Sequence, residues 1–167
     1  MNVRQSCLLF FAMCASHGAV PAQVTKLQPF SITISTPAEV VKPGSEVRLD
    51  ISLKNLLDKT ILLPKNVGQE ETDADYVIEV RDSTGRSATE TQRGQMIRGK
   101  GTKRYFGSIR WVGAKPGETL KESVALNKDF DLNKPGKYVI QIQRYVPDDL
   151  GGGGVKSNVI SVSVNPE

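Results

Sequence analysis

Hydrophobic and polar residues alternate along much of the chain with a period of two. The pattern is clearest in residues 46–54, where aliphatic side chains alternate with charged residues and Ser52. Because successive side chains of a β-strand point to opposite faces of a sheet, this pattern predicts a strand with one buried face. The same argument predicts strands at residues 30–35, 76–81, 138–144 and 158–164, the first of them at a sheet edge.

Three further strands are predicted from less regular patterns. Residues 61–63 form a short apolar run that Pro64 is expected to end, because proline cannot donate to a strand ladder. Residues 108–112 return to an extended apolar pattern. In residues 119–126, Glu122 interrupts the alternation of apolar side chains, so this strand is the least regular of the three.

Turns and one irregular segment separate the strands. The Asp-Ser-Thr-Gly turn at residues 82–85 predicts a hairpin in which residues 86–91 return as a polar strand. Residues 92–107 have neither a helical nor a strand period, which predicts an irregular connection. The whole pattern predicts an all-β fold, an antiparallel sandwich of about seven to nine strands, without an amphipathic helix.

The first residues have the layout of a secretory signal peptide. Arg4 precedes an apolar run at residues 7–15, and Ala22 occupies the position at which a signal peptidase cleaves. We therefore expect residues 1–22 to be the signal peptide and residues 23–167 to form one domain. The predicted location is the periplasm or the exterior of the cell.

Three alternatives for this segment are less favoured. Cleavage after Ala19 is one of them. Lipidation of Cys14 is another, but Met13 before it is larger than the small residue that a lipobox requires. A membrane anchor needs roughly 20 apolar residues, about twice the length of this run, so the protein is not expected to span a membrane.

Both cysteines, Cys7 and Cys14, and the single histidine, His17, lie in the expected signal segment. The mature chain then has neither thiol nor imidazole, which excludes Ser-His-Asp and Cys-His catalysis and argues against zinc or copper sites. Its stability must come from apolar burial and sheet hydrogen bonds. Loss of Arg4 lowers the formal net charge from +4 to +3, which gives no reason to expect a nucleic-acid partner.

Carboxylates remain as candidate chemistry. They gather in two predicted loops, one with Glu70, Glu71, Asp73 and Asp75 and one with Asp148 and Asp149. Such groups can bind calcium or form the acid pair of a hydrolase. The spacing of a calcium loop is absent, however, and acidic loop residues are more often simply solvated. We therefore predict no catalytic residue, no metal site and no cofactor.

A basic group with aromatic neighbours lies in and beside the irregular segment. Its members are Arg93, Arg98, Lys100, Lys103, Arg104 and Arg110, with Tyr105, Phe106 and Trp111. Such a group can bind an anionic glycan, a lipid surface or a nucleic acid, with Arg98, Lys100, Lys103, Arg104 and Tyr105 as its candidate ligand residues. The simpler interpretation is a solvated loop with Phe106 and Trp111 packed into the core, which gives Trp111 a structural role.

Residues 145–154 connect the last two predicted strands, at an end of the sandwich where this fold class places binding loops. Tyr145, Asp148 and Asp149 are its candidate contact residues. The four successive glycines at residues 151–154 favour a flexible connector, because ordering them on binding costs conformational entropy.

Three C-terminal segments resemble immunoglobulin-like modules of exported bacterial proteins. They are P-G-E-T-L at 116–120, D-L-N-K-P-G-K-Y-V-I-Q-I-Q-R at 131–144 and S-N-V-I-S-V-S-V at 157–164. The resemblance implies that Tyr138, just after a Pro-Gly corner at Gly136, forms a tyrosine corner whose hydroxyl bonds to upstream backbone. An ordinary packed tyrosine is the alternative. The cysteine pair of antibody domains is absent, so only the broader class is implied.

Together these observations predict an exported, non-enzymatic module that contacts an envelope protein or an anionic glycan through strand-end loops or an open sheet edge. The alternative is an immunoglobulin-like protease inhibitor, although the Asn-Pro-Thr-Thr-Gly loop of the chagasin type is absent. An acid-dependent hydrolase, with only carboxylates, tyrosine and lysine for proton transfer, is a third interpretation. The sequence predicts neither the identity of the partner nor the oligomeric state.

Overall fold

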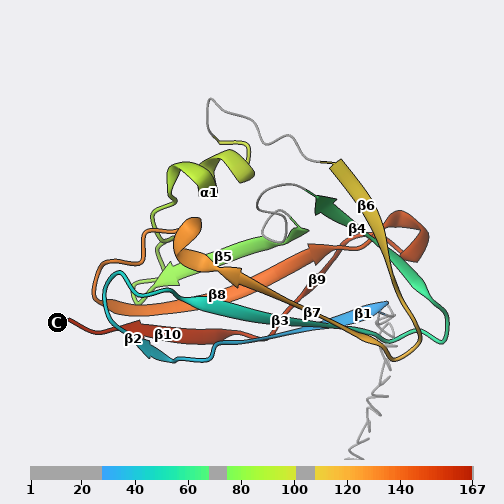
Figure 1. The fold of residues 1–167 in the computed structure, drawn as a ribbon, viewed down its shortest axis with the longest axis horizontal. Helices are drawn as coiled ribbons and strands as arrows, with labels where there is room; N and C mark the ends of the chain where they lie inside the picture. The colour runs from blue at the N-terminus through green and yellow to red at the C-terminus, as the bar shows by residue number, and fades with distance from the viewer. Residues whose placement is uncertain (1–27, 68–74, 101–107, 167) are drawn as a thin grey trace, which may run out of the picture.

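The computed structural model describes residues 28–67, 75–100 and 108–166, and about half of these residues lie in strands (Figure 1). One sheet has the order β1-β3-β7, with β1 at Phe30–Ser35, β3 at Arg48–Asn55 and β7 at Thr119–Ala125. The second has the order β2-β10-β8-β5, with β2 at Val40–Val41, β10 at Ile160–Val164, β8 at Gly136–Tyr145 and β5 at Val77–Asp82. A short strand, β9 at Gly154–Lys156, pairs with β8.

A third, two-stranded sheet consists of β4 at Ile61–Val67 and β6 at Ser108–Ala114, and we call it the ribbon. It lies at one end of the molecule, above the other sheets in the view of Figure 1. The described helices are short: α1 at Gln92–Ile97, η2 at Leu126–Lys128 and η3 at Asp148–Leu150. None of the described helices is long and apolar enough to cross a bilayer.

The predicted all-β sandwich is confirmed. Strand pairing is antiparallel except for β2 and β10, which run parallel. The described residues contain ten strands where seven to nine were predicted, and the surplus comes from β2 and β9, which are too short to show a pattern in the sequence. The predicted edge position of residues 30–35 is also confirmed, because β1 pairs with β3 alone within its sheet.

The core lies between the inward faces of the two larger sheets. The alternation that predicted the strands is observed directly: Leu49, Ile51 and Leu53 of β3 and Ile140 and Ile142 of β8 are all buried. Burying each such side chain contributes roughly 1.5–3 kcal/mol relative to leaving it exposed. Apolar burial therefore holds the described sheets together in the way that the sequence predicts.

The chain enters β8 through the expected corner. Gly136 has a φ of 152°, a conformation that favours glycine. The hydroxyl of the buried Tyr138 donates a 2.9 Å hydrogen bond to the carbonyl of Lys134, four residues upstream. This hydrogen bond has the partners that the resemblance to a tyrosine corner implies.

Two predictions between β5 and β6 were wrong. Residues 86–91 do not return as a strand: the carboxylate of Asp82 accepts from the backbone N–H groups of Thr84 and Arg86, and only isolated bridges follow. The described part of segment 92–107 begins as a helix, because the hydroxyl of Thr91 caps α1 by accepting from the N–H of Gly94 at 3.1 Å. Residues 101–107 lie outside the described residues, as does the predicted signal segment 1–22.

Pro64 does not end its strand either. β4 continues through Pro64 to Val67 and pairs with β6 along its whole length. Pro64 is tolerated because its backbone points away from β6, as described below for the candidate site.

Candidate functional site

The ribbon has one buried and one exposed face. Its register pairs Leu62 with Gly113, Pro64 with Trp111, and Asn66 with Ile109. Directly opposed residues of an antiparallel pair share a face, so the side chains of these pairs lie on one side of the ribbon. The alternate residues, which include the buried Ile61, Leu63 and Ala114, face the core.

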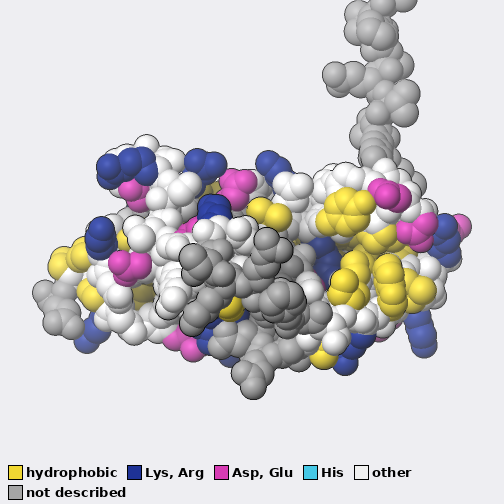
Figure 2. Space-filling model, turned by 90° about the horizontal axis from the view of Figure 1, so that it is seen from above, with side chains coloured by type: hydrophobic (Ala, Val, Ile, Leu, Met, Phe, Trp, Pro, Cys, Tyr) yellow, Lys and Arg dark blue, Asp and Glu magenta, His cyan; other side chains and the backbone are white. Residues whose placement is uncertain are grey.

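The exposed face is strongly apolar. Leu62 is 55% exposed, Ile109 65% and Trp111 62%. Figure 2 shows hydrophobic side chains gathered on the surface at the end of the molecule where the ribbon lies. Contiguous exposed apolar surface of this kind often marks an interaction site.

The prediction that Trp111 packs into the core was therefore wrong. The inward positions of β6 belong to Val112 and Ala114, and the strand period of two turns Trp111 to the opposite side. Sequence reasoning placed Trp111 inside because an apolar run in a strand does not indicate which of its two faces is covered. Phe106, the other predicted core residue of this group, lies outside the described residues.

The backbone of β4 points away from β6 at alternate residues. The carbonyl of Pro64 accepts a 2.6 Å hydrogen bond from Nη2 of Arg144, and the N–H of Asn66 donates at 2.8 Å to Oδ1 of Asp75. In an antiparallel ladder, pairs that exchange hydrogen bonds alternate with pairs whose N–H and C=O groups point outward. Pro64 thus occupies an outward-pointing position, where its missing N–H costs the ribbon no bond.

A buried polar cluster covers this edge of β4. The side chains of Arg144 and Asp75 are 6% and 1% exposed, and Nη2 of Arg144 lies 3.9 Å from Oδ2 of Asp75. The guanidinium of Arg144 also stacks over the ring of Tyr76, 4.9 Å from its centre. Because an unpaired buried charge is costly, these mutual contacts hold β4 firmly against β8.

The contacts of Glu122 explain why a charged residue interrupts the apolar alternation of β7. Its carboxylate faces inward from β7, where Oε1 accepts from Nζ of Lys65 at 2.6 Å and Oε2 accepts from the hydroxyl of Tyr76 at 2.9 Å. The charge that broke the apolar alternation is therefore the partner of a lysine on the ribbon. The broken alternation was the signal in the sequence, but it did not reveal which cation Glu122 would pair with.

Burial shifts the titration of this cluster. Removal from water raises the pKa of Asp75, against the opposing effect of its hydrogen bonds from Asn66 and of the charge of Arg144. Removal from water also raises the pKa of Tyr76, further supported by the negative charge of Glu122. The phenol of Tyr76 thus stays protonated and donates to Glu122, and the cluster acts as an anchor for the ribbon.

The structure pairs much of the predicted basic group with acids. Arg93 bonds to the fully buried Asp129. The carboxylate of Glu90 forms ion pairs with Arg98, at 3.5 Å, and with Lys100, at 2.9 Å. The guanidinium of Arg98 also stacks over the ring of Phe130. These contacts attach α1 to the sandwich and neutralise much of the positive charge that an anionic ligand would need.

The structure does not bring the other members of the basic group together with Arg93, Arg98 and Lys100. Lys103, Arg104 and Tyr105 lie outside the described residues. Arg110 is exposed on β6, where it forms no ion pair with any residue that the structure describes. The ligand role predicted for this group therefore stays a prediction.

Hydrogen bonds close the loop after β8, which contains the four successive glycines. The hydroxyl of Tyr145 donates to Oδ1 of Asp148 at 2.7 Å, and the N–H of Val146 donates to the carbonyl of Gly153 at 2.9 Å. Asp149 lies in the short helix η3, and Gly151 after it takes a φ of 107°. The glycines provide the left-handed backbone that this compact turn requires.

Acidic residues do not converge on a metal site within the described ranges, where no group of three or more His, Cys, Asp or Glu side chains is placed to hold an ion. Asp75 bonds to Asn66, and Asp148 bonds to Tyr145. Glu70, Glu71 and Asp73 lie outside the described residues.

Neither a protein-family model nor a curated protein matches the chain. The chain is similar to solved structures of a β-glucosidase from Listeria innocua, in complex with glucose, with a TM-score of 0.43, 13% identity, and coverage of 81% of this chain and 16% of that chain. It is also similar to the structural genomics target SoR45, with a TM-score of 0.45, 7% identity, and coverage of 81% and 87%. The chain thus spans only a small part of the β-glucosidase, and likenesses this weak carry no argument about function.

Proposed function

We propose that this protein is an exported, non-enzymatic module that binds another protein through the exposed face of the ribbon. The observation that carries the proposal is the exposure of Trp111, together with Ile109 and Leu62, on a face anchored from behind by buried charges. Rigidly presented tryptophan side chains are enriched at protein interfaces, where they supply much of the binding energy.

Two further observations support this proposal over an enzyme. The expected mature chain lacks histidine and cysteine. The buried titratable groups Asp75, Tyr76 and Glu122 bond to other residues of the protein. The tyrosine corner at Tyr138 and the apolar N-terminal run agree with the immunoglobulin-like and exported character of the proposal. The proposed contact surface is the ribbon, in place of the strand-end loops that the sequence favoured.

Site-specific photo-crosslinking in cells tests this function. A photoreactive residue in place of Ile109 lies on the proposed face, and one in place of Val159, which is 56% exposed, is a matched control away from the ribbon. We expect a discrete adduct with an envelope protein from position 109, absent from position 159 and lost when Trp111→Ala is added. Equal adducts at both positions, or none at either, would contradict the proposal.

A protease inhibitor is the second candidate, and the ordered loop after β8 favours it. The bond from Tyr145 to Asp148 and the backbone turn at Gly153 reduce the entropy that the loop would lose on entering an active-site cleft. A panel of secreted serine, cysteine and metalloproteases provides the test. Inhibition that is lost in the variant Tyr145→Phe supports this candidate, and activity of every protease at micromolar protein retires it.

A further inference from the structure

The outer edge of β6 carries backbone groups that point away from the ribbon. Since Pro64 and Asn66 point outward from β4, their ladder partners Trp111 and Ile109 point outward from β6, and so does Gly113 two residues further on. No strand among the described residues pairs with this edge. Three N–H and three C=O groups are therefore directed away from β4 along a strand that is exposed at almost every residue.

Two other sheet edges among the described residues, those of β1 and β4, are covered by side chains. At β1, the amide of Asn158 both donates to the carbonyl of Ile34 and accepts from its N–H, at 3.0 and 2.8 Å. At β4, Arg144 and Asp75 play the corresponding part. Proteins usually protect an exposed edge in such ways because it otherwise recruits another strand. The uncovered edge of β6 is thus suited to receiving one.

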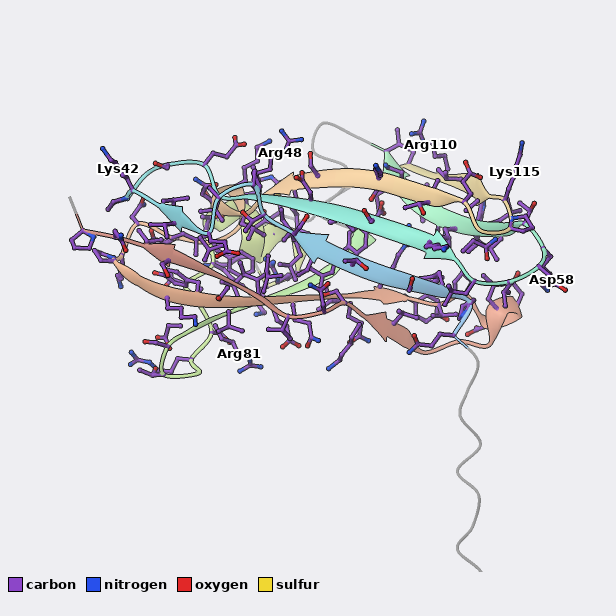
Figure 3. All side chains as sticks on the ribbon, turned by 90° about the horizontal axis from the view of Figure 1, so that it is seen from below. Lys42, Arg48, Asp58, Arg81, Arg110 and Lys115 are labelled. Atoms are coloured by element: carbon purple, nitrogen blue, oxygen red, sulfur yellow. The ribbon has the colours of Figure 1, made fainter. Side chains whose placement is uncertain are left out.

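The charge of this edge indicates which kind of strand fits. The two strands of the ribbon contain Lys65 and Arg110 and no acidic residue. Lys65 is neutralised by Glu122, but Arg110 and the exposed Lys115 after it form no ion pair within the described ranges. Figure 3 shows Arg110 and Lys115 projecting from the same side of the molecule. A strand with acidic side chains on that side would complement them.

We infer that the edge of β6 binds an extended acidic segment of the partner protein as an added β-strand. In this arrangement, the backbone of Ile109, Trp111 and Gly113 exchanges hydrogen bonds with the segment. Side chains opposite these three residues are apolar and extend the exposed face, while those opposite Arg110 and Val112 are acidic. The inference rests on the proposed function and names the class of partner for that same site.

A synthetic peptide provides a defined probe of this inference. The acetylated and amidated heptapeptide Thr-Val-Glu-Val-Glu-Val-Thr places valine opposite the three outward residues and glutamate between them. Trp111 is the one tryptophan of the chain, so its fluorescence reports binding directly. We expect saturable binding of this peptide and about tenfold weaker binding, equivalent to 1.4 kcal/mol, of the same peptide with lysine in place of glutamate.

Matched variants of Gly113 separate backbone pairing from simple apolar contact. Gly113→Pro removes one outward N–H that β4 does not use, whereas Gly113→Ala keeps it, and the added Cβ meets only Leu62 and Thr60 at ordinary contact distances. We expect binding in Gly113→Ala and a loss of at least several-fold in Gly113→Pro. Equal binding by the two variants, both folded, would overturn the inference.

Charge reversal keeps the test decisive if Gly113→Pro fails to fold. Arg110→Glu should exchange the preference, so that the lysine peptide binds more tightly than the glutamate peptide. If Arg110→Glu still binds the glutamate peptide more tightly than the lysine peptide, the assignment of an acidic partner is overturned.

Concentration-dependent dimers that disappear in Gly113→Pro would also overturn this assignment, since they would show that the edge of β6 binds a second copy of the chain. If Trp111→Ala abolishes the cellular crosslink while Gly113→Pro does not, the proposed function stands and strand addition fails.

Discussion

The two edges of the ribbon differ in what meets their backbone groups. On β4, the carbonyl of Pro64 and the N–H of Asn66 bond to the buried side chains of Arg144 and Asp75. On β6, the corresponding groups of Trp111 and Ile109 have no strand beside them among the described residues. The comparison teaches that the chain places its buried charges at the edge of β4, where they fix the ribbon, and leaves exposed apolar residues at the edge of β6.

The largest effect should come from breaking the covered edge. Arg144→Met removes the hydrogen bond to Pro64 and leaves Asp75 buried without its cation. We expect the free energy of unfolding to fall by about 3 kcal/mol in urea titrations. The matched control is Arg110→Met on the open edge, where a change within about 0.5 kcal/mol is expected. Similar losses in both variants would mean that the edges do not differ.

A smaller loss is expected from the second anchor of the ribbon. Glu122→Gln removes the charge that pairs with Lys65, whose side chain is 17% exposed, and weakens the bond from Tyr76. The free energy of unfolding should fall by about 1–2 kcal/mol. Glu79→Gln, at an exposed ion pair with Arg81, should cost almost nothing in the same titration. A Glu122 variant as stable as wild type would rule out this anchor.

The pH dependence of the free energy of unfolding should reveal the titration of the Asp75 carboxyl group. Because burial raises its pKa in the folded state above the unfolded value of 3.8, its contribution to stability is fully present below that value and is lost as pH rises through the folded pKa. Relative to Asp75→Asn, which cannot titrate, the wild-type protein should therefore lose stability as pH rises above the unfolded value and through the raised folded pKa of Asp75. Urea titrations of both proteins across this range provide the measurement. A difference that stays constant with pH would contradict the assignment.

The smallest change in stability is expected on the exposed face. Trp111→Ala should alter the free energy of unfolding by no more than about 0.5 kcal/mol, because the side chain is already largely in water. Its ribbon neighbour Leu63→Ala, on the buried face, should cost about 3 kcal/mol. A severe loss in Trp111→Ala would show that the tryptophan supports the fold rather than a partner.

The sequence predicted the sandwich well because alternation reports burial one strand at a time. The hydrogen bond of Tyr138 to upstream backbone is the contact that the resemblance to immunoglobulin-like modules implied. The sequence pattern misplaced Trp111 because the covered face of β6 depends on β4, more than forty residues earlier in the chain. Likewise, the roles of Arg144 and Glu122 depend on contacts 80 and 57 residues away, with Pro64 and Lys65, which no local pattern contains.

Amide hydrogen exchange measured residue by residue tests the open edge most directly. The account predicts an alternating pattern along β6, in which the N–H groups of Arg110 and Val112, bonded to β4, exchange slowly and those of Ile109, Trp111 and Gly113 exchange rapidly. On β4, the N–H of Asn66 should be protected by Asp75. Uniform protection along β6, with Trp111 exchanging as slowly as Arg110, would contradict the account.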